Sequence, residues 1–107
     1  MFKQKEIIKY VPVPSFGAYN DLWQNKGYLQ ETASVTNSRV WYVEVTEALR
    51  MVREKADSAE TPEELKGCNY AISIIKKMLL LHTAAKNRIS DIEYKEQLNK
   101  EAEKTIN

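Results

Sequence analysis

The sequence contains few of the residues that end helices or form covalent cross-links. Its 107 residues include only three glycines, three prolines and one cysteine, Cys68. A single cysteine excludes an internal disulfide and fits a reducing compartment. His82 is the only histidine, so a zinc site would need carboxylates as its other ligands. We therefore predict no metal site.

The motifs of common enzyme sites are also missing. Gly17, Gly27 and Gly67 lie too far apart for a phosphate-binding loop, and neither GxSxG nor HExxH occurs. His82 lies on an apolar helix face and has no acid close in sequence to orient it as a general base. We predict that the protein is not an enzyme and has neither catalytic residues nor a cofactor.

No strictly apolar run exceeds four residues, whereas a membrane-spanning helix needs about 20. We also expect no signal peptide, because no long apolar segment follows the basic N-terminus. These features predict a cytoplasmic protein, or a virion component if a phage encodes it. The preference for Lys, Asn, Ile and Tyr is typical of an AT-rich bacterial or phage genome.

The net charge of +1 conceals blocks of opposite sign. The blocks carry net charges of +2, −4, +5 and −2, in the order 1–30, 31–64, 65–88 and 89–107. We expect the basic block to lie beside its acidic neighbours, as in antiparallel helices. The alternative is an outward basic stripe that binds nucleic acid. Its candidate phosphate contacts are Lys76, Lys77, Lys86 and Arg88.

The first clear helix spans about residues 39–59. Spacings of three and four separate its apolar residues, which is typical of one helix face. Segment 39–45 is also rich in β-branched and aromatic residues. The alternative is therefore an α+β fold, in which 39–45 pairs with 6–13 in a small two-stranded sheet. We favour the helix because its periodicity continues unbroken to Ala56.

Two further helix starts follow. Thr61 suits an N-cap and Pro62 the first helical position. Asn87 suits the left-handed end of a helix, and Ser90 suits the cap of the next one. We predict an all-α, three-helix arrangement over about these ranges: 39–59, 62–87 and 91–105.

The sequence from Ile89 to Tyr94, ISDIEY, follows an apolar helix. It resembles the short C-terminal helical hairpins called SHOCT domains, in which a glycine precedes Ile-Ser/Thr, two residues, a Glu and an aromatic. Asn87 and Arg88 stand in the place of that glycine. The resemblance, over about a quarter of the chain, implies a helical hairpin that takes part in oligomerisation.

Residues 1–37 differ from the helical domain predicted over 38–107. Two prolines close a β-prone stretch at 6–14, which opposes a central strand and favours an extended arm. A short helix is predicted around 18–25. Aromatic side chains on a pre-extended arm suit recognition of a partner, because little conformational entropy is lost on binding. The alternative is that the arm folds back over the protein's own helices.

These observations predict a non-enzymatic protein–protein interaction module that acts as a homo-oligomeric or accessory subunit. A phage or bacterial structural component, or an inhibitor of a host protein, would fit this description. The predicted partner-binding residues include Leu80, which interrupts the polar side of the central helix. The set is Tyr10, Pro12, Pro14, Phe16, Tyr19, Trp23, Tyr28 and Leu80. The alternative function is a small nucleic-acid-binding regulator that uses segment 65–88.

Overall fold

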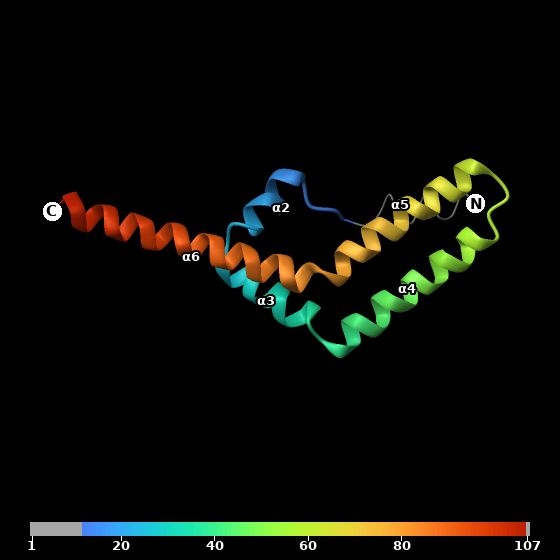
Figure 1. Cartoon of the computed structure of the whole chain (residues 1–107), viewed down its shortest axis with the longest axis horizontal. Helices are drawn as coiled ribbons and strands as arrows, with labels where there is room; N and C mark the ends of the chain where they lie inside the picture. Colours follow the sequence, from blue (N-terminus) through green and yellow to red (C-terminus); the bar gives the residue numbers. More distant parts are fainter. Residues whose placement is uncertain (1–11, 107) are drawn as a thin grey trace.

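The computed structural model describes residues 12–106, which form five α-helices and no strand (Figure 1). The all-α prediction is confirmed, whereas the three-helix arrangement is not matched. The two additional helices lie in the first third of the chain, and the break predicted near 87–91 lies at Leu80 instead. The helices are α2 (Phe16–Leu22), α3 (Lys26–Thr36), α4 (Arg39–Asp57), α5 (Pro62–Leu79) and α6 (Leu81–Ile106).

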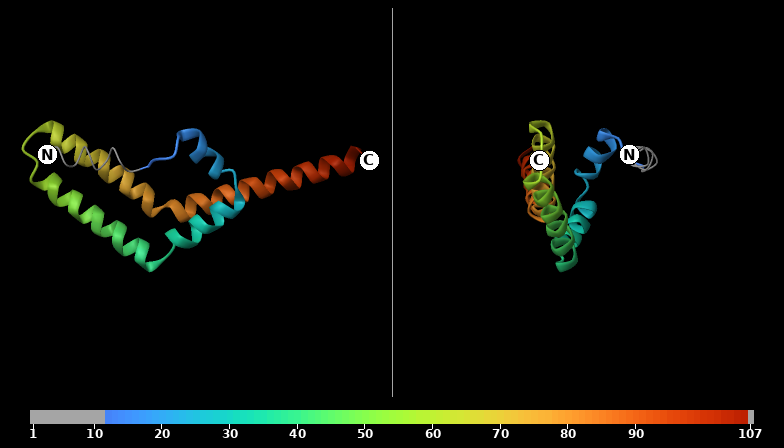
Figure 2. Two further views of the ribbon diagram at one scale, coloured as in Figure 1. Left: turned by 180° about the vertical axis from the view of Figure 1, so that it is seen from behind. Right: turned by 90° about the vertical axis from the view of Figure 1, so that its right-hand side faces the viewer.

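The four longer helices form two antiparallel pairs joined end to end. α4 packs on α5, and α3 packs on the first part of α6 (Figure 1). The molecule measures 68 × 27 × 27 Å, and its radius of gyration is 19.3 Å. A compact domain of this length would have a radius of about 13 Å. The two pairs form nearly one layer, and α2 lies to one side of it (Figure 2).

Side-chain caps begin four of the helices. In each case the oxygen of a polar side chain accepts a hydrogen bond from a backbone N–H three residues later, which satisfies an otherwise unpaired donor. The predicted cap at Thr61 is confirmed, and the Glu64 carboxylate accepts from the N–H of Glu60 at 3.1 Å. The caps are Ser15, Asn25, Ser38 and Thr61.

The helix predicted over 39–59 is confirmed as α4. Val45 and Leu49 are buried one helical turn apart, so burial follows the helical period rather than the alternation of a strand. The alternative strand over 39–45 is therefore wrong. Residues 6–11 of its expected partner lie outside the described residues.

The long helix predicted over 62–87 is interrupted at Leu80, although no glycine or proline lies near the break. The break faces the turn between α3 and α4 (Figure 1). There the Trp41 indole N–H donates to the carbonyl oxygen of Met78 at 3.0 Å. The last carbonyls of a helix have no partner within the helix. A backbone N–H at the end of α5 already donates to the Met78 carbonyl oxygen, and the Trp41 indole gives this oxygen a second donor.

The turn predicted at 87–91 does not form, because α6 continues through it. Ala85 is buried, and Ile89 and Ile92 are half-buried against α3. This continuous apolar face keeps the segment helical. Asn87 does not adopt the left-handed conformation predicted for it, since no non-glycine residue among those described has a positive φ. The helical hairpin implied by the SHOCT resemblance is therefore wrong at this position.

The extended arm expected over 1–37 also differs from the structure. Residues 26–36 form α3, in which Leu29 is fully buried against α6. Lys26 at its start pairs with Glu96 of α6 at 3.1 Å. Of the described part of this segment, residues 12–15 precede the first helix without regular secondary structure, and α2 takes the place of the short helix predicted around 18–25.

The contribution of the hydrogen bond from the Trp41 indole to the Met78 carbonyl oxygen can be tested directly. We expect Trp41→Phe to lower the free energy of unfolding by about 1 kcal/mol, because it removes the indole donor and leaves the Met78 carbonyl oxygen half-buried without that partner. Urea unfolding at one fixed protein concentration measures the change. Tyr42→Phe is the control, since the Tyr42 side chain is 63% exposed and its change should be below about 0.5 kcal/mol.

Candidate functional site

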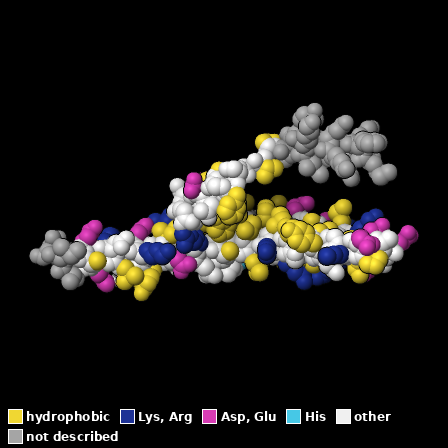
Figure 3. All heavy atoms as spheres, turned by 90° about the horizontal axis from the view of Figure 1, so that it is seen from above, with side chains coloured by type: hydrophobic (Ala, Val, Ile, Leu, Met, Phe, Trp, Pro, Cys, Tyr) yellow, Lys and Arg dark blue, Asp and Glu magenta, His cyan; other side chains and the backbone are white. Residues whose placement is uncertain are grey.

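The buried core is small for a chain of this length. Within residues 12–104 only six residues are buried: Leu29, Ala33, Thr36, Val45, Leu49 and Ala85. Large apolar side chains on several helices remain exposed, and Figure 3 shows them distributed along the layer. These exposed apolar side chains make the surface of the layer the region to search for a candidate site.

An apolar groove runs between α4 and α5 near their connecting turn and encloses about 390 Å³. The groove is open because α5 presents small residues to it. A Cβ atom added at Gly67 would meet nothing within 4 Å, and Cys68 and Ala71 add little volume. Its lining is Met51, Val52, Lys55, Glu64, Gly67, Cys68 and Ala71.

The groove extends into a longer surface, which we call the groove face. Successive helical residues are 100° apart, so residues spaced by three or four share one side of each helix. Met51, Tyr70 and Ile74 on this face are exposed by 58%, 70% and 43%. The groove face comprises Glu44, Ala48, Met51 and Lys55 of α4 and Glu63, Gly67, Tyr70, Ile74 and Lys77 of α5.

The sequence-based set of partner-binding residues did not include the groove face. A signal for it exists in the spacing of Gly67, Tyr70, Ile74 and Lys77, which adds a second side to the buried face of α5. The apolar arc on this helix is therefore wider than one neighbouring helix covers. Only that excess width distinguishes a contact surface from an ordinary core face.

The aromatic residues predicted to bind a partner fall into two groups. Phe16 is 83% exposed at the start of α2, and Pro12 and Pro14 are exposed before it. Trp23 and Tyr28 are half-buried, and Trp23 packs against the core formed by α3 and α6. The remaining members differ as well: Tyr19 is 42% exposed, Leu80 is 60% exposed, and Tyr10 lies outside the described residues.

Trp23 joins α2 to the body. Its ring lies 6.1 Å from that of Tyr19, centroid to centroid, with the planes tilted by 50°. The Arg88 Nε–H donates to the Trp23 carbonyl oxygen at 3.2 Å, and another guanidinium N–H donates to Gln24. Arg88 therefore holds the end of α2 on α6.

The other bases of the predicted nucleic-acid site do not share one side of a helix. Lys76 and Lys77 are exposed and consecutive, so they point about 100° apart. Lys86 is exposed on α6, beyond the break. With Arg88 engaged by α2, these residues form no continuous basic stripe.

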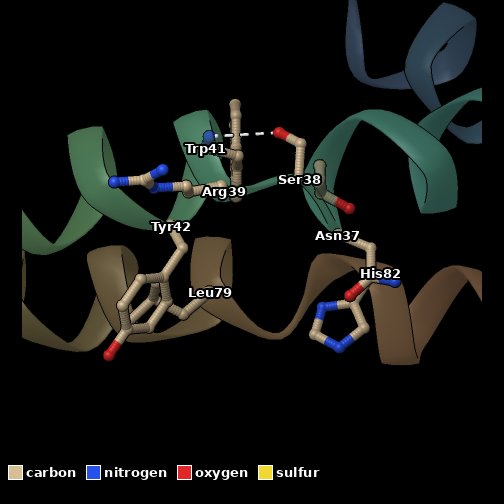
Figure 4. A pocket seen from close by; sticks show the side chains of 8 residues that line it. Asn37, Ser38, Arg39, Trp41, Tyr42, Leu79 and His82 are labelled. Carbon is tan, nitrogen blue, oxygen red and sulfur yellow. Dashed lines mark hydrogen bonds between the residues drawn. The ribbon is translucent and has the colours of Figure 1, made fainter.

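His82 lies beside a cavity of about 280 Å³ at the bend, lined also by Asn37, Tyr42 and Leu79 (Figure 4). Its Nδ1 atom is buried and has no hydrogen-bond partner within residues 12–106. No carboxylate lines the cavity. A general base needs an orienting partner, and the described lining provides no acid for that role.

A cluster of charges lies on the outer side of α4. Arg50 donates to the carboxylates of Glu47 and Glu54, three and four residues away. The hydrogen bond from Arg50 lowers the pKa of Glu47 below its ordinary value, and the same pair raises the pKa of Arg50. Both side chains are exposed, so this cluster supports α4 locally.

Within residues 12–106 no cluster of three or more His, Cys, Asp or Glu side chains could hold a metal ion. No helix in the same range combines the length and apolar character that crossing a bilayer requires. No protein-family model, curated protein or solved structure matches the chain.

Burial of α3 in the body predicts a large effect of core truncation. We expect Leu29→Ala to lower the free energy of unfolding by about 2–5 kcal/mol, because it empties a fully buried site. Leu98→Ala removes the same atoms from a side chain that is 45% exposed and should change it by less than about 1 kcal/mol. Equal effects in chemical denaturation would contradict the packing of α3 on α6.

The charge cluster on α4 predicts a change in titration. In Arg50→Gln the pKa of Glu47 should rise toward 4.5, because its main hydrogen-bond donor is lost. A lowered carboxyl pKa adds stability above the unfolded-state value, and this contribution is lost as pH falls through the folded-state value. NMR titration of the Glu47 side chain measures the shift. Arg53→Gln is the control and should leave the Glu47 titration unchanged.

Proposed function

We propose that this protein is a non-enzymatic protein–protein interaction module that acts as a homo-oligomeric or accessory subunit. One observation carries the proposal: the body is a single layer, two helices wide and one helix thick, with six buried residues in 12–104. A chain of 107 residues is long enough to bury a substantial core by itself. An additional chain that covers the exposed apolar surface would supply the missing core.

The distribution of exposed apolar residues supports this function over nucleic-acid binding. Met51, Tyr70 and Ile74 gather on one face, and Val13 and Phe16 form a second exposed site at α2. Aromatic residues and Met are enriched in protein interfaces. Binding of nucleic acid through segment 65–88 has less support, because Arg88 is engaged in the body.

An oligomeric subunit should gain stability from mass action. We expect the melting temperature to rise by about 3 °C for each tenfold increase in protein concentration, as for a dimer of this chain length. Circular dichroism at several concentrations measures the shift, and light scattering during size-exclusion chromatography gives the mass. A monomeric mass with a constant melting temperature would contradict self-association.

A further inference from the structure

We propose that the groove face joins two copies of this chain, with α4 and α5 of one copy each antiparallel to the same helix of the other. The inference rests on the proposed function and specifies its partner and its surface. It follows from the charge pattern of the groove face, from the register of the hairpin and from the position of α2.

Charges of alternating sign mark the four corners of the groove face. On α4, Glu44 lies toward the bend and Lys55 toward the connecting turn. On α5 the order is reversed, with Lys77 toward the bend and Glu63 toward the turn. Among residues 12–106 none of these four side chains forms an ion pair. All four are exposed and available to another chain.

The hairpin register aligns these charges about a common centre. Trp41 lies level with Met78, to which it is bonded, and Val52 and Cys68 both line the groove. The midpoint between Glu44 and Lys55 falls between residues 49 and 50, and the midpoint between Glu63 and Lys77 is Tyr70. In the register set by the two contacts, these midpoints lie at the same level.

A single two-fold axis that crosses both helices at this level pairs every corner with an opposite charge. Glu44 meets Lys55 of the second copy, and Glu63 meets Lys77. Met51 then lies opposite Ala48 of the second copy, and the two Tyr70 rings meet near the axis. Such an interface is isologous, the commonest arrangement for homodimers.

The position of α2 selects this axis. A two-fold axis parallel to the helices would also pair unlike charges, Glu44 with Lys77 and Lys55 with Glu63. However, α2 lies to one side of the layer, beside the α3–α6 pair (Figure 2). Arg88, which bonds the end of α2, precedes the half-buried Ile89 by one residue, just as Gly67 precedes the half-buried Cys68 on a helix of similar direction, so this is the groove-face side. The parallel axis would bring the second copy's α3–α6 pair against it. The crossing axis directs that pair beyond the 58–61 turn, where α2 does not lie.

The groove face also has the size and composition of an interface. α5 is about 27 Å long at the usual helical rise, and two packed helices are about 20 Å wide. Their product is about 540 Å² for each copy, so the two copies together reach the total of roughly 1,000 Å² that a specific interface needs. The apolar centre and charged rim of the groove face match the usual anatomy of a specific interface.

Charge reversal on α4 tests the pairing. Glu44→Lys and Lys55→Glu should each raise the dimer dissociation constant about tenfold or more, because each places like charges together twice per dimer. The double variant Glu44→Lys/Lys55→Glu restores both pairs and should return to within about threefold of the wild type. Sedimentation equilibrium of the full chain measures all four constants.

Arg53→Glu is the matched control, because it reverses a charge on the same helix but on the opposite side of the layer. Its dissociation constant should equal that of the wild type, and circular dichroism should show the same helix content in every variant. Unchanged dimerisation in Glu44→Lys and Lys55→Glu would place the interface elsewhere and overturn this inference, while the proposed function stands.

Three other outcomes also overturn the inference. A double variant that dimerises more weakly than either single variant would assign the axis parallel to the helices. A wild-type chain that is monomeric at every concentration, and dimerises only after residues 1–11 are removed, would assign the groove face to that segment. A chain that is monomeric in both forms would overturn self-association itself, and with it the homo-oligomeric form of the proposed function.

Discussion

The hydrogen bond from the Trp41 indole to the Met78 carbonyl lies where both arms of the molecule change direction. One arm bends at the turn between α3 and α4, and the other breaks at Leu80, opposite that turn. Because both bends occur at one level, α3 remains paired with α6 and α4 with α5. Neither pair folds onto the other, so the layer stays one helix thick. The exposed apolar surface is a direct result of this geometry.

Local signals in the sequence predicted part of this fold well. Thr61 caps α5 as expected, and the periodicity of 39–59 identified α4 in spite of its β-prone first turns. The break at Leu80 could not be predicted, because the local sequence contains no helix breaker and the side chain that bonds beside the break, Trp41, lies 39 residues away in sequence. Tertiary packing also explains why Ser90 does not cap a helix, although the local sequence predicted that it would. A capping pattern forms a cap only where packing allows the helix to end, and Ile89 and Ile92 pack through that point.

The candidate site shows a similar division. Of the aromatic residues predicted to bind a partner, Phe16 is exposed at the start of α2, whereas Trp23 packs against the core formed by α3 and α6. Composition alone cannot separate these cases, because both residues are aromatic and lie among turn-forming neighbours. The groove face depends on which side of α5 is left uncovered. That is decided by the number of helices that pack on it, which no local pattern encodes.

The two helix pairs also differ in how far apart their contacts lie along the chain. The α4–α5 pair joins residues such as Val52 and Cys68, whose separation is short, around the four-residue connection 58–61. The core of α3 and α6 joins Leu29 to Ala85, so its closure encloses about half of the chain. Loop closure costs more entropy for longer loops, and local contacts form fastest. We therefore expect the hairpin to form first during folding and to bring the distant segments α3 and α6 within reach of each other.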